Sequence, residues 1–221
     1  MTMTEFVIHS IPGSPFGRAV LLALEEKGCD YRFALVPPGS LRQPEHQARH
    51  PFSRIPVLEH GAFRLYETQA ILRYLDRVAP EPALTPVDPQ RAAVMDQMMN
   101  VNDWYLFQGV SNVIGFERVV APRLMGRPTD EAAIAATMPR AQAVFAALAD
   151  HLADQPYFAG DAISLADLML APQIDFYRGL PEWDLLISPH ANLLGWIDRM
   201  CARPSMVATT WERVAEMAKA A

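Results

Sequence analysis

The chain has 221 residues, of which 51% are hydrophobic and 20% are charged, and its formal net charge is -6. This composition is that of a globular protein with one or two domains, and it excludes an intrinsically disordered chain. The acidic balance argues against a nucleic-acid-binding protein, which usually presents a basic face. We therefore expect no nucleic-acid partner.

The two cysteines, Cys29 and Cys201, stand far apart in the sequence. They suggest neither a disulfide framework nor a metal-ligand cluster, so we expect a reducing, cytoplasmic setting and no metal. The start of the chain lacks a basic region followed by a long apolar run, and no apolar run approaches the roughly 18 residues that span a membrane. The sequence therefore predicts neither a signal peptide nor a membrane partner.

The first part of the chain alternates strand and helix patterns. A short apolar run at 6–8 predicts a strand, and the apolar positions after Pro15 predict a helix that ends at Gly28. The stretch 31–36 is typical of a second strand. A strand, helix, strand unit of this kind places its two strands parallel, with a right-handed crossover.

A hairpin and a helix are predicted next. An apolar, β-branched run at 55–58 indicates a buried strand, a turn signal follows at 59–61, and alternation at 63–65 indicates a second strand. Apolar residues at helical spacing over 70–78 predict the helix. The order βαβ followed by ββα is thioredoxin-like, and we expect this α+β domain over residues 1–80.

Pro56 stands at the start of the hairpin, where it gives no ladder hydrogen bond. If the Ile55–Pro56 bond is cis, the backbone N–H and C=O of Ile55 face outward and can pair with an extended peptide. Glu67 and Thr68 stand where the next helix begins, and a helix N-terminus suits a carboxylate. Such a site would suit a small acidic peptide.

The segment HPFSRIPVLEHGAFRLYETQAI, residues 50–71, resembles the glutathione-site segment NPFGKVPVLEDG…LYES.AI of cytosolic glutathione transferases. An ordinary hairpin and helix with an edge proline is the alternative interpretation. The resemblance implies that glutathione is the co-substrate, that no separate cofactor is needed, and that the glutathione-binding residues include Ile55, Pro56, Glu67 and Thr68.

Ser14 precedes Pro15 and is a preferred helix N-cap residue, a structural role worth about 1 kcal/mol. The sequence SPFGRAV resembles the S-P-x-x-R-x-V loop of serine-type transferases, which suggests a theta-, phi- or zeta-like bacterial member. The resemblance implies that Ser14 donates a hydrogen bond to the glutathione sulfur and stabilises its thiolate. Ser10 is the alternative, because the loop could fold to present it instead.

Many serine-type relatives carry a histidine at the position that is Leu41 here, with Arg42 beside it. Arg54 stands where the family has Lys or Gln. Because an Arg fork suits a carboxylate, Arg42 and Arg54 are candidates for binding the glycine carboxylate of glutathione. Plain surface charge is the alternative for both. We include Leu41, Arg42 and Arg54 in the expected glutathione site.

The proline-rich stretch 81–89 is the expected linker, and an all-helical domain is expected over 90–221 because no strand pattern appears there. FAGDAISLAD, residues 158–167, resembles the family's F-x-G-x-x-x-S-x-A-D signature, and its Ser164 and Asp167 have the spacing of a capping box. The helices are expected at 90–120, 131–153, 165–178, 191–201 and 205–218.

The first of these helices is rich in methionine and aromatic residues, which suit either a core or an adaptable wall for an apolar ligand. By analogy with the family, the pocket for a small apolar electrophile combines Ile11 and Pro12 with Tyr105 and Phe116. Core packing is the alternative for the two aromatic residues. The resemblance also implies a homodimer.

The whole chain thus resembles a glutathione transferase with a thioredoxin-like domain followed by a helical domain. The predicted reaction is attack of the glutathione thiolate on the electrophile. Fold does not decide the chemistry, so two alternatives stay open. One is a glutathione-dependent isomerase, dehalogenase or disulfide reductase on the same fold. The other is a non-catalytic binding or interaction protein.

Overall fold

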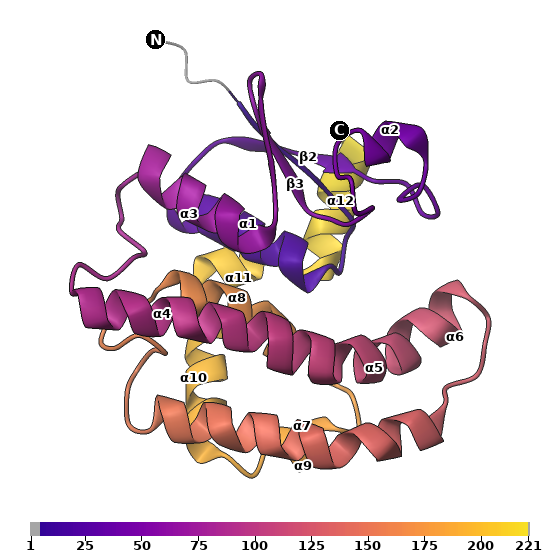
Figure 1. Cartoon of the computed structure of the whole chain (residues 1–221), viewed down its shortest axis with the longest axis vertical. Helices are drawn as coiled ribbons and strands as arrows, with labels where there is room; N and C mark the ends of the chain where they lie inside the picture. Colours follow the sequence, from indigo (N-terminus) through magenta and orange to yellow (C-terminus); the bar gives the residue numbers. More distant parts are fainter. Residues whose placement is uncertain (1–4, 221) are drawn as a thin grey trace. The chain divides into compact units, whose positions relative to one another are not determined.

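The computed structural model describes residues 5–220, which form two compact units (Figure 1). One unit combines the chain up to Leu84 with the segment from Ala202 onward, and the other is Thr85–Cys201. This division differs from the expected helical domain over 90–221, because the end of the chain belongs to the first unit.

The first unit contains a four-stranded mixed sheet. Its strands stand in the order β2-β1-β3-β4, with β1 and β2 parallel and the other neighbours antiparallel. This confirms the predicted thioredoxin-like order. The elements are β1 (Phe6–Ser10), α1 (Pro15–Glu26), β2 (Tyr31–Leu35), α2 (Pro44–Gln47), β3 (Val57–His60), β4 (Phe63–Tyr66) and α3 (Thr68–Val78).

The apolar runs that predicted these elements form the core of the first unit. Ile8 of β1 and Leu58 of β3 are paired across the sheet and fully buried, as are Leu22 of α1 and Leu72 of α3. The α1 helix ends as predicted, with Gly28 at φ +60, a conformation that glycine adopts without a Cβ clash. Helices α1 and α3 pack on each other beside the sheet (Figure 1).

Two further helices come from the end of the chain, α11 (Pro204–Ala208) and α12 (Trp211–Ala220). The sequence predicted one helix over 205–218, and this prediction is wrong, because the helix is broken at Thr209 and Thr210. Thr209 interrupts the helix with φ -113 and ψ 26, and its buried hydroxyl donates to the carbonyl of Ser205. The short α11 packs on α1, and α12 packs on β2.

The second unit is helical throughout, as predicted. Its first helical run, expected as one α-helix over 90–120, alternates between α-helical and π-helical hydrogen bonding. Helix α8 ends earlier than expected, and α9 was not predicted. The elements are α4 (Pro89–Val101), η1 (Asn102–Ser111), α5 (Asn112–Gly115), η2 (Phe116–Val120), α6 (Ala121–Leu124), α7 (Glu131–Leu152), α8 (Leu165–Asp175), α9 (Trp183–Leu186) and α10 (Ala191–Cys201), where η marks π-helix.

A buried carboxylate organises the start of α8. Asp167 is fully buried and accepts hydrogen bonds from the backbone N–H of Ser164 at 2.9 Å, the Ser164 hydroxyl at 2.7 Å, the Phe158 N–H at 3.0 Å and Trp196 Nε1 at 2.9 Å. The predicted capping box is present. Its carboxylate also accepts hydrogen bonds from two other segments, those of Phe158 and Trp196. Burial raises the pKa of Asp167, and these donors oppose that rise.

Helix α7 is the one described helix that is long and apolar enough, by length and composition alone, to cross a membrane. One face of it carries buried Ile134, Phe145 and Leu152 in the core of the second unit. Its first residue, Glu131, forms an ion pair with Arg118 of η2. These contacts are those of a helix in a helical bundle.

Candidate functional site

The sheet register brings the predicted glutathione segments of the first unit to one end of the sheet. His9 pairs with Val57, and Val57 pairs with Tyr66. The loop after β1, the Ile55–Pro56 bond before β3 and the start of α3 after β4 therefore lie side by side. The loop that follows β2 joins them, because Ser10 pairs with Leu35.

Ser14 occupies the N-cap position of α1, as predicted. Its Oγ accepts a hydrogen bond from the backbone N–H of Gly17 at 3.1 Å, and the residue is half-buried. A serine hydroxyl that accepts one hydrogen bond keeps its own proton to donate. The first turn of α1 carries no acidic residue, so nothing in this turn neutralises the positive end of the helix dipole.

Ser10, the alternative to Ser14, is fully buried. Its Oγ lies directly beneath α1, where a Cβ on Gly17 would come within 2.2 Å of it. Only a glycine allows the helix to approach the end of β1 this closely. The Ser10 hydroxyl is thus covered by the helix, whereas Ser14 lies at its partly exposed end.

The Ile55–Pro56 bond is cis, the geometry on which the peptide-binding hypothesis depended. Pro56 is buried, and Ile55 is half-buried. Glu67 is exposed at the N-cap position of α3 and has φ +71 and ψ 114, a left-handed backbone that few non-glycine residues adopt. Thr68, the first residue of α3, is buried. The sequence contains no signal for the unusual backbone of Glu67.

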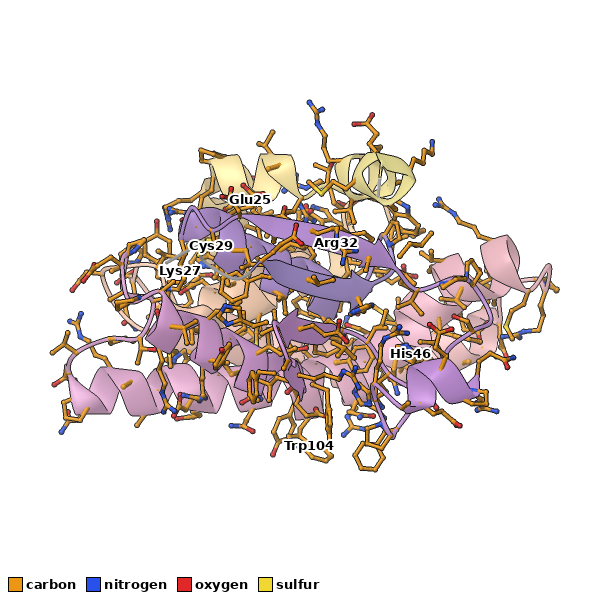
Figure 2. All side chains as sticks on the ribbon, turned by 90° about the horizontal axis from the view of Figure 1, so that it is seen from above. Glu25, Lys27, Cys29, Arg32, His46 and Trp104 are labelled. Carbon is orange, nitrogen blue, oxygen red and sulfur yellow. The ribbon has the colours of Figure 1, made fainter. Side chains whose placement is uncertain are left out.

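The three residues expected near the glycine carboxylate lie in loops. Leu41 is half-buried in the turn before α2, and Arg42 and Arg54 are exposed. Sequence reasoning missed His46 of α2, which is labelled in Figure 2. This buried side chain hydrogen-bonds through Nε2 to the carbonyl oxygen of Arg54 at 2.8 Å. This hydrogen bond connects α2 to the loop that leads to Ile55.

A second buried histidine supports the same loop. The ring of His50 packs against Tyr66 at 4.6 Å between centroids, and its Nδ1 accepts from the Phe52 N–H at 3.3 Å. Burial lowers the pKa of His50, which favours the neutral ring that this acceptor role requires. His46 and His50 thus position the residues that precede the cis bond.

The four residues expected in the second-substrate pocket are divided between the two units. Ile11 and Pro12 are half-buried in the loop after β1. Tyr105 is 57% exposed in η1, and half-buried Phe116 in η2 lies under the guanidinium of Arg127, 5.8 Å from the ring centroid. Tyr105 is thus not the core residue that was its alternative interpretation. Its neighbour Trp104 is also exposed (Figure 2).

Among residues 5–220, no group of three or more His, Cys, Asp and Glu side chains is arranged to hold a metal ion. The chemistry available at the sheet end is that of a hydroxyl, two helix N-termini, backbone amides and exposed arginines. Such groups stabilise anions through hydrogen bonds and charge.

The sequence matches two family models. Residues 8–83 match the model described as glutathione S-transferase, N-terminal domain, and residues 131–199 match the model described as glutathione S-transferase, C-terminal domain. The first match begins inside β1, at Ile8, and runs through β4 and α3. The segment from Ala202 onward lies outside both matched ranges.

Plant proteins are among the similar sequences. Glutathione S-transferase F14 of Arabidopsis thaliana is 31% identical over 86% of this chain and 77% of its own length. Glutathione S-transferase 4 of Zea mays is 33% identical over 87% and 86%.

Solved structures agree with these relatives. Glutathione transferase F7 of Populus trichocarpa superposes with a TM-score of 0.84 at 25% identity, over 96% of this chain and 99% of that one. A glutathione S-transferase-I bound with lactoylglutathione gives 0.82 at 25% identity, over the same shares.

Proposed function

The chain belongs to the glutathione S-transferase family, and we propose that it is a serine-type member that activates the glutathione thiol with Ser14. The observation that carries this proposal is the partly exposed Ser14 hydroxyl, held at the N-terminus of α1 by the Gly17 N–H. It stands at the sheet end to which the register brings the cis Ile55–Pro56 bond and the start of α3.

The proposed chemistry is stabilisation of the thiolate. The Gly17 N–H donates to Ser14 Oγ, which fixes the hydroxyl and directs its proton to the glutathione sulfur. The helix N-terminus adds partial positive charge, and both effects lower the thiol pKa from about 8.5 toward neutrality. The thiolate then forms a carbon–sulfur bond with the electrophile as the bond from that carbon to a leaving group breaks. The leaving group departs with the electron pair and takes up the proton that the thiol released, directly or through solvent.

The structure favours Ser14 over Ser10 for this role. A donor to the glutathione sulfur must be reachable by substrate, and the Ser10 hydroxyl is fully buried beneath Gly17. The Ser14 hydroxyl is partly exposed and already oriented. Ser10 therefore has a packing role in this proposal.

We propose that glutathione lies along the end of the sheet. The Ile55 backbone, next to Pro56, would pair with the peptide backbone, as an added edge strand does. The start of α3, with Glu67 and Thr68, would hold the γ-glutamyl end.

Arg42 and Arg54 would bind the glycine carboxylate, with Leu41 beside them. Their exposure leaves both guanidinium groups accessible to a ligand. His46 supports this arrangement, because it holds the carbonyl of Arg54.

The second substrate is proposed to be a small apolar electrophile that contacts Ile11, Pro12, Tyr105 and Phe116. The exposed ring of Tyr105 supports this assignment, because an exposed aromatic side chain is available to a ligand. A homodimer in the cytoplasm completes the proposal, in line with the family resemblance.

The test is glutathione binding and thiolate formation in three proteins: wild type, Ser14→Ala and Ser10→Ala. Calorimetry reports binding, and ultraviolet absorbance reports the thiolate as the pH is varied. We expect all three to bind glutathione, and only Ser14→Ala to lose the thiolate near neutral pH. Loss of the thiolate in Ser10→Ala with retention in Ser14→Ala would reverse the assignment. If the wild-type protein fails to bind glutathione at millimolar concentration, the proposal that it is a glutathione transferase is refuted.

A further inference from the structure

The end of the chain is anchored to α1 in the first unit. Arg203 donates from Nε and Nη2 to the two carboxylate oxygens of Glu26, at 2.7 Å and 2.6 Å, and the Ser205 hydroxyl donates to the same carboxylate. The Glu26 side chain is only 10% exposed, so this bidentate pair is shielded from water. The pair fixes α11 to the C-terminal end of α1.

A second set of contacts reaches the other end of α1. Arg18, in the first turn, donates from Nη2 to the carbonyl oxygen of Met206 at 3.0 Å and from Nε to Thr209 Oγ1 at 3.4 Å. The backbone N–H of Arg18 in turn donates to the carbonyl oxygen of Ser14 at 2.8 Å. The residue one helical turn after Ser14 is therefore held by the end of the chain.

The residue immediately before Ser14 is held as well. The indole of Trp211 lies against Gly13, so that a Cβ on this glycine would come within 2.5 Å of Trp211 Cε3 and 2.6 Å of Cζ3. Gly13 has φ +81, a conformation that disfavours any other residue. The six-membered ring of Trp211 thus fills the space beside the backbone of the loop that presents Ser14.

We propose that Trp211 is a positioning residue for Ser14. This inference rests on the proposed thiol activation by Ser14. The end of the chain holds the loop on both sides of the serine, at Gly13 through Trp211 and at Arg18 through Met206 and Thr209. Hydrogen-bond catalysis depends on the donor's position to a fraction of an ångström, so loss of the indole should misdirect the Ser14 hydroxyl.

The test compares Trp211→Ala and Trp211→Phe with wild type, using Val207→Ala of α11 as a control at an exposed site on the same segment. For Trp211→Ala we expect kcat to fall about tenfold and the pKa of bound glutathione to rise toward its free value, with little change in the KM for glutathione. Trp211→Phe keeps an aromatic ring and should retain most of the wild-type behaviour. Val207→Ala should match wild type.

An unchanged thiolate pKa and kcat in a folded Trp211→Ala variant would overturn the proposal. The melting temperature and circular dichroism spectrum of each variant establish whether it is folded. Failure of the proposed function looks different, because wild type would then form no thiolate, or Ser14→Ala would form it normally.

A double-mutant cycle provides a second test that does not require Trp211→Ala to be fully stable. Gly13→Ala should reduce kcat, since its Cβ meets the indole and its φ is strained. In the Trp211→Ala background the clash is absent, so the same substitution should reduce kcat by a smaller factor. Equal factors in both backgrounds would show that the indole does not constrain Gly13 and would overturn the proposal.

Discussion

Helices α1 and α8 each have a serine at the N-cap position, and these two serines have opposite surroundings. Ser14 at the start of α1 is partly exposed, its first turn carries no acidic residue, and its Oγ accepts from a backbone N–H. Ser164 at the start of α8 is fully buried, and its hydroxyl donates to the carboxylate of Asp167. The same residue type at the same helix position is thus open to a ligand in one unit and enclosed in the other.

The difference lies in what satisfies the helix N-terminus. In α8 the Asp167 carboxylate supplies the negative charge, and buried donors from Phe158 and Trp196 complete its hydrogen bonds. In α1 the first turn lacks such a carboxylate, so an external anion can take that place. An N-cap serine therefore indicates a ligand site only where the helix end is accessible and lacks its own acid.

The largest effect is expected from removing the carboxylate that encloses the α8 end. Asp167→Ala leaves the buried Trp196 and Phe158 N–H groups without an acceptor, and it should lower the free energy of unfolding by about 3–5 kcal/mol. Urea unfolding measures this. Asp161→Ala is the matched control, because Asp161 is exposed and pairs with Arg91 at the surface. If Asp167→Ala lowers the free energy of unfolding no more than Asp161→Ala does, the buried carboxylate does not distinguish the start of α8 from the start of α1.

The next effect concerns turnover. Ser14→Ala should lower kcat roughly a hundredfold, because one directed hydrogen-bond donor to the developing charge is lost. Steady-state kinetics with glutathione and a range of electrophiles measure it. Ser164→Ala, assayed well below its melting temperature, should retain wild-type kcat. Equal turnover losses in the two variants would mean that the two caps do not differ in function.

Removing either serine cap should lower the stability of the protein by less than removing Asp167 does. Ser14→Ala and Ser164→Ala should each lower the free energy of unfolding by about 1 kcal/mol, since each removes one side-chain hydrogen bond at a helix end. Comparison of their denaturation midpoints with that of wild type sharpens the contrast, because similar stability losses would accompany very different effects on kcat. A Ser164→Ala variant with an unchanged midpoint would contradict the structural role of that cap.

The smallest effect depends on pH and concerns the other end of α1. Burial raises the pKa of Glu26, but hydrogen bonds from Arg203 and Ser205 outweigh burial and lower it overall. A carboxyl with a lowered folded pKa stabilises the protein above its unfolded pKa, near 4.5, and loses that contribution as the pH falls through the folded value. Thermal melts should therefore separate wild type from Glu26→Gln at pH 7. The two should approach each other below about pH 4. A constant difference at all pH values would contradict the pairing.

Much of the first unit could be predicted from local signals. The apolar runs at 55–58 and 63–65, the turn glycine and the Ser14-Pro15 pair each fix the conformation of a few neighbouring residues. They predicted the order of the hairpin strands along the chain and the start of α1. The capping box at Ser164 and Asp167 is equally local, because both residues lie within one helical turn. These features depend on spacing that is visible in the sequence.

Long-range contacts could not be predicted in this way. The enclosure of Asp167 requires Trp196, and the burial of Ser10 requires Gly17 to come close to the end of β1. The break at Thr209 and the return of the chain end to α1 depend on Glu26 and Arg18 as partners. The periodicity of apolar residues gives no information on which residues far apart in the sequence come into contact. These long-range contacts are therefore seen only in the folded chain.

The sequence by itself indicated the fold class and the family, since both follow from contiguous motifs, and it left Ser14 and Ser10 as two candidates for activating a thiol. Tertiary structure decided which serine remains accessible, which histidine holds the Arg54 carbonyl, and which residue lies against Gly13. The physical reason is that accessibility and close packing are properties of the space around a residue. That space is filled here by Trp211, His46 and Gly17, from segments that only folding brings together.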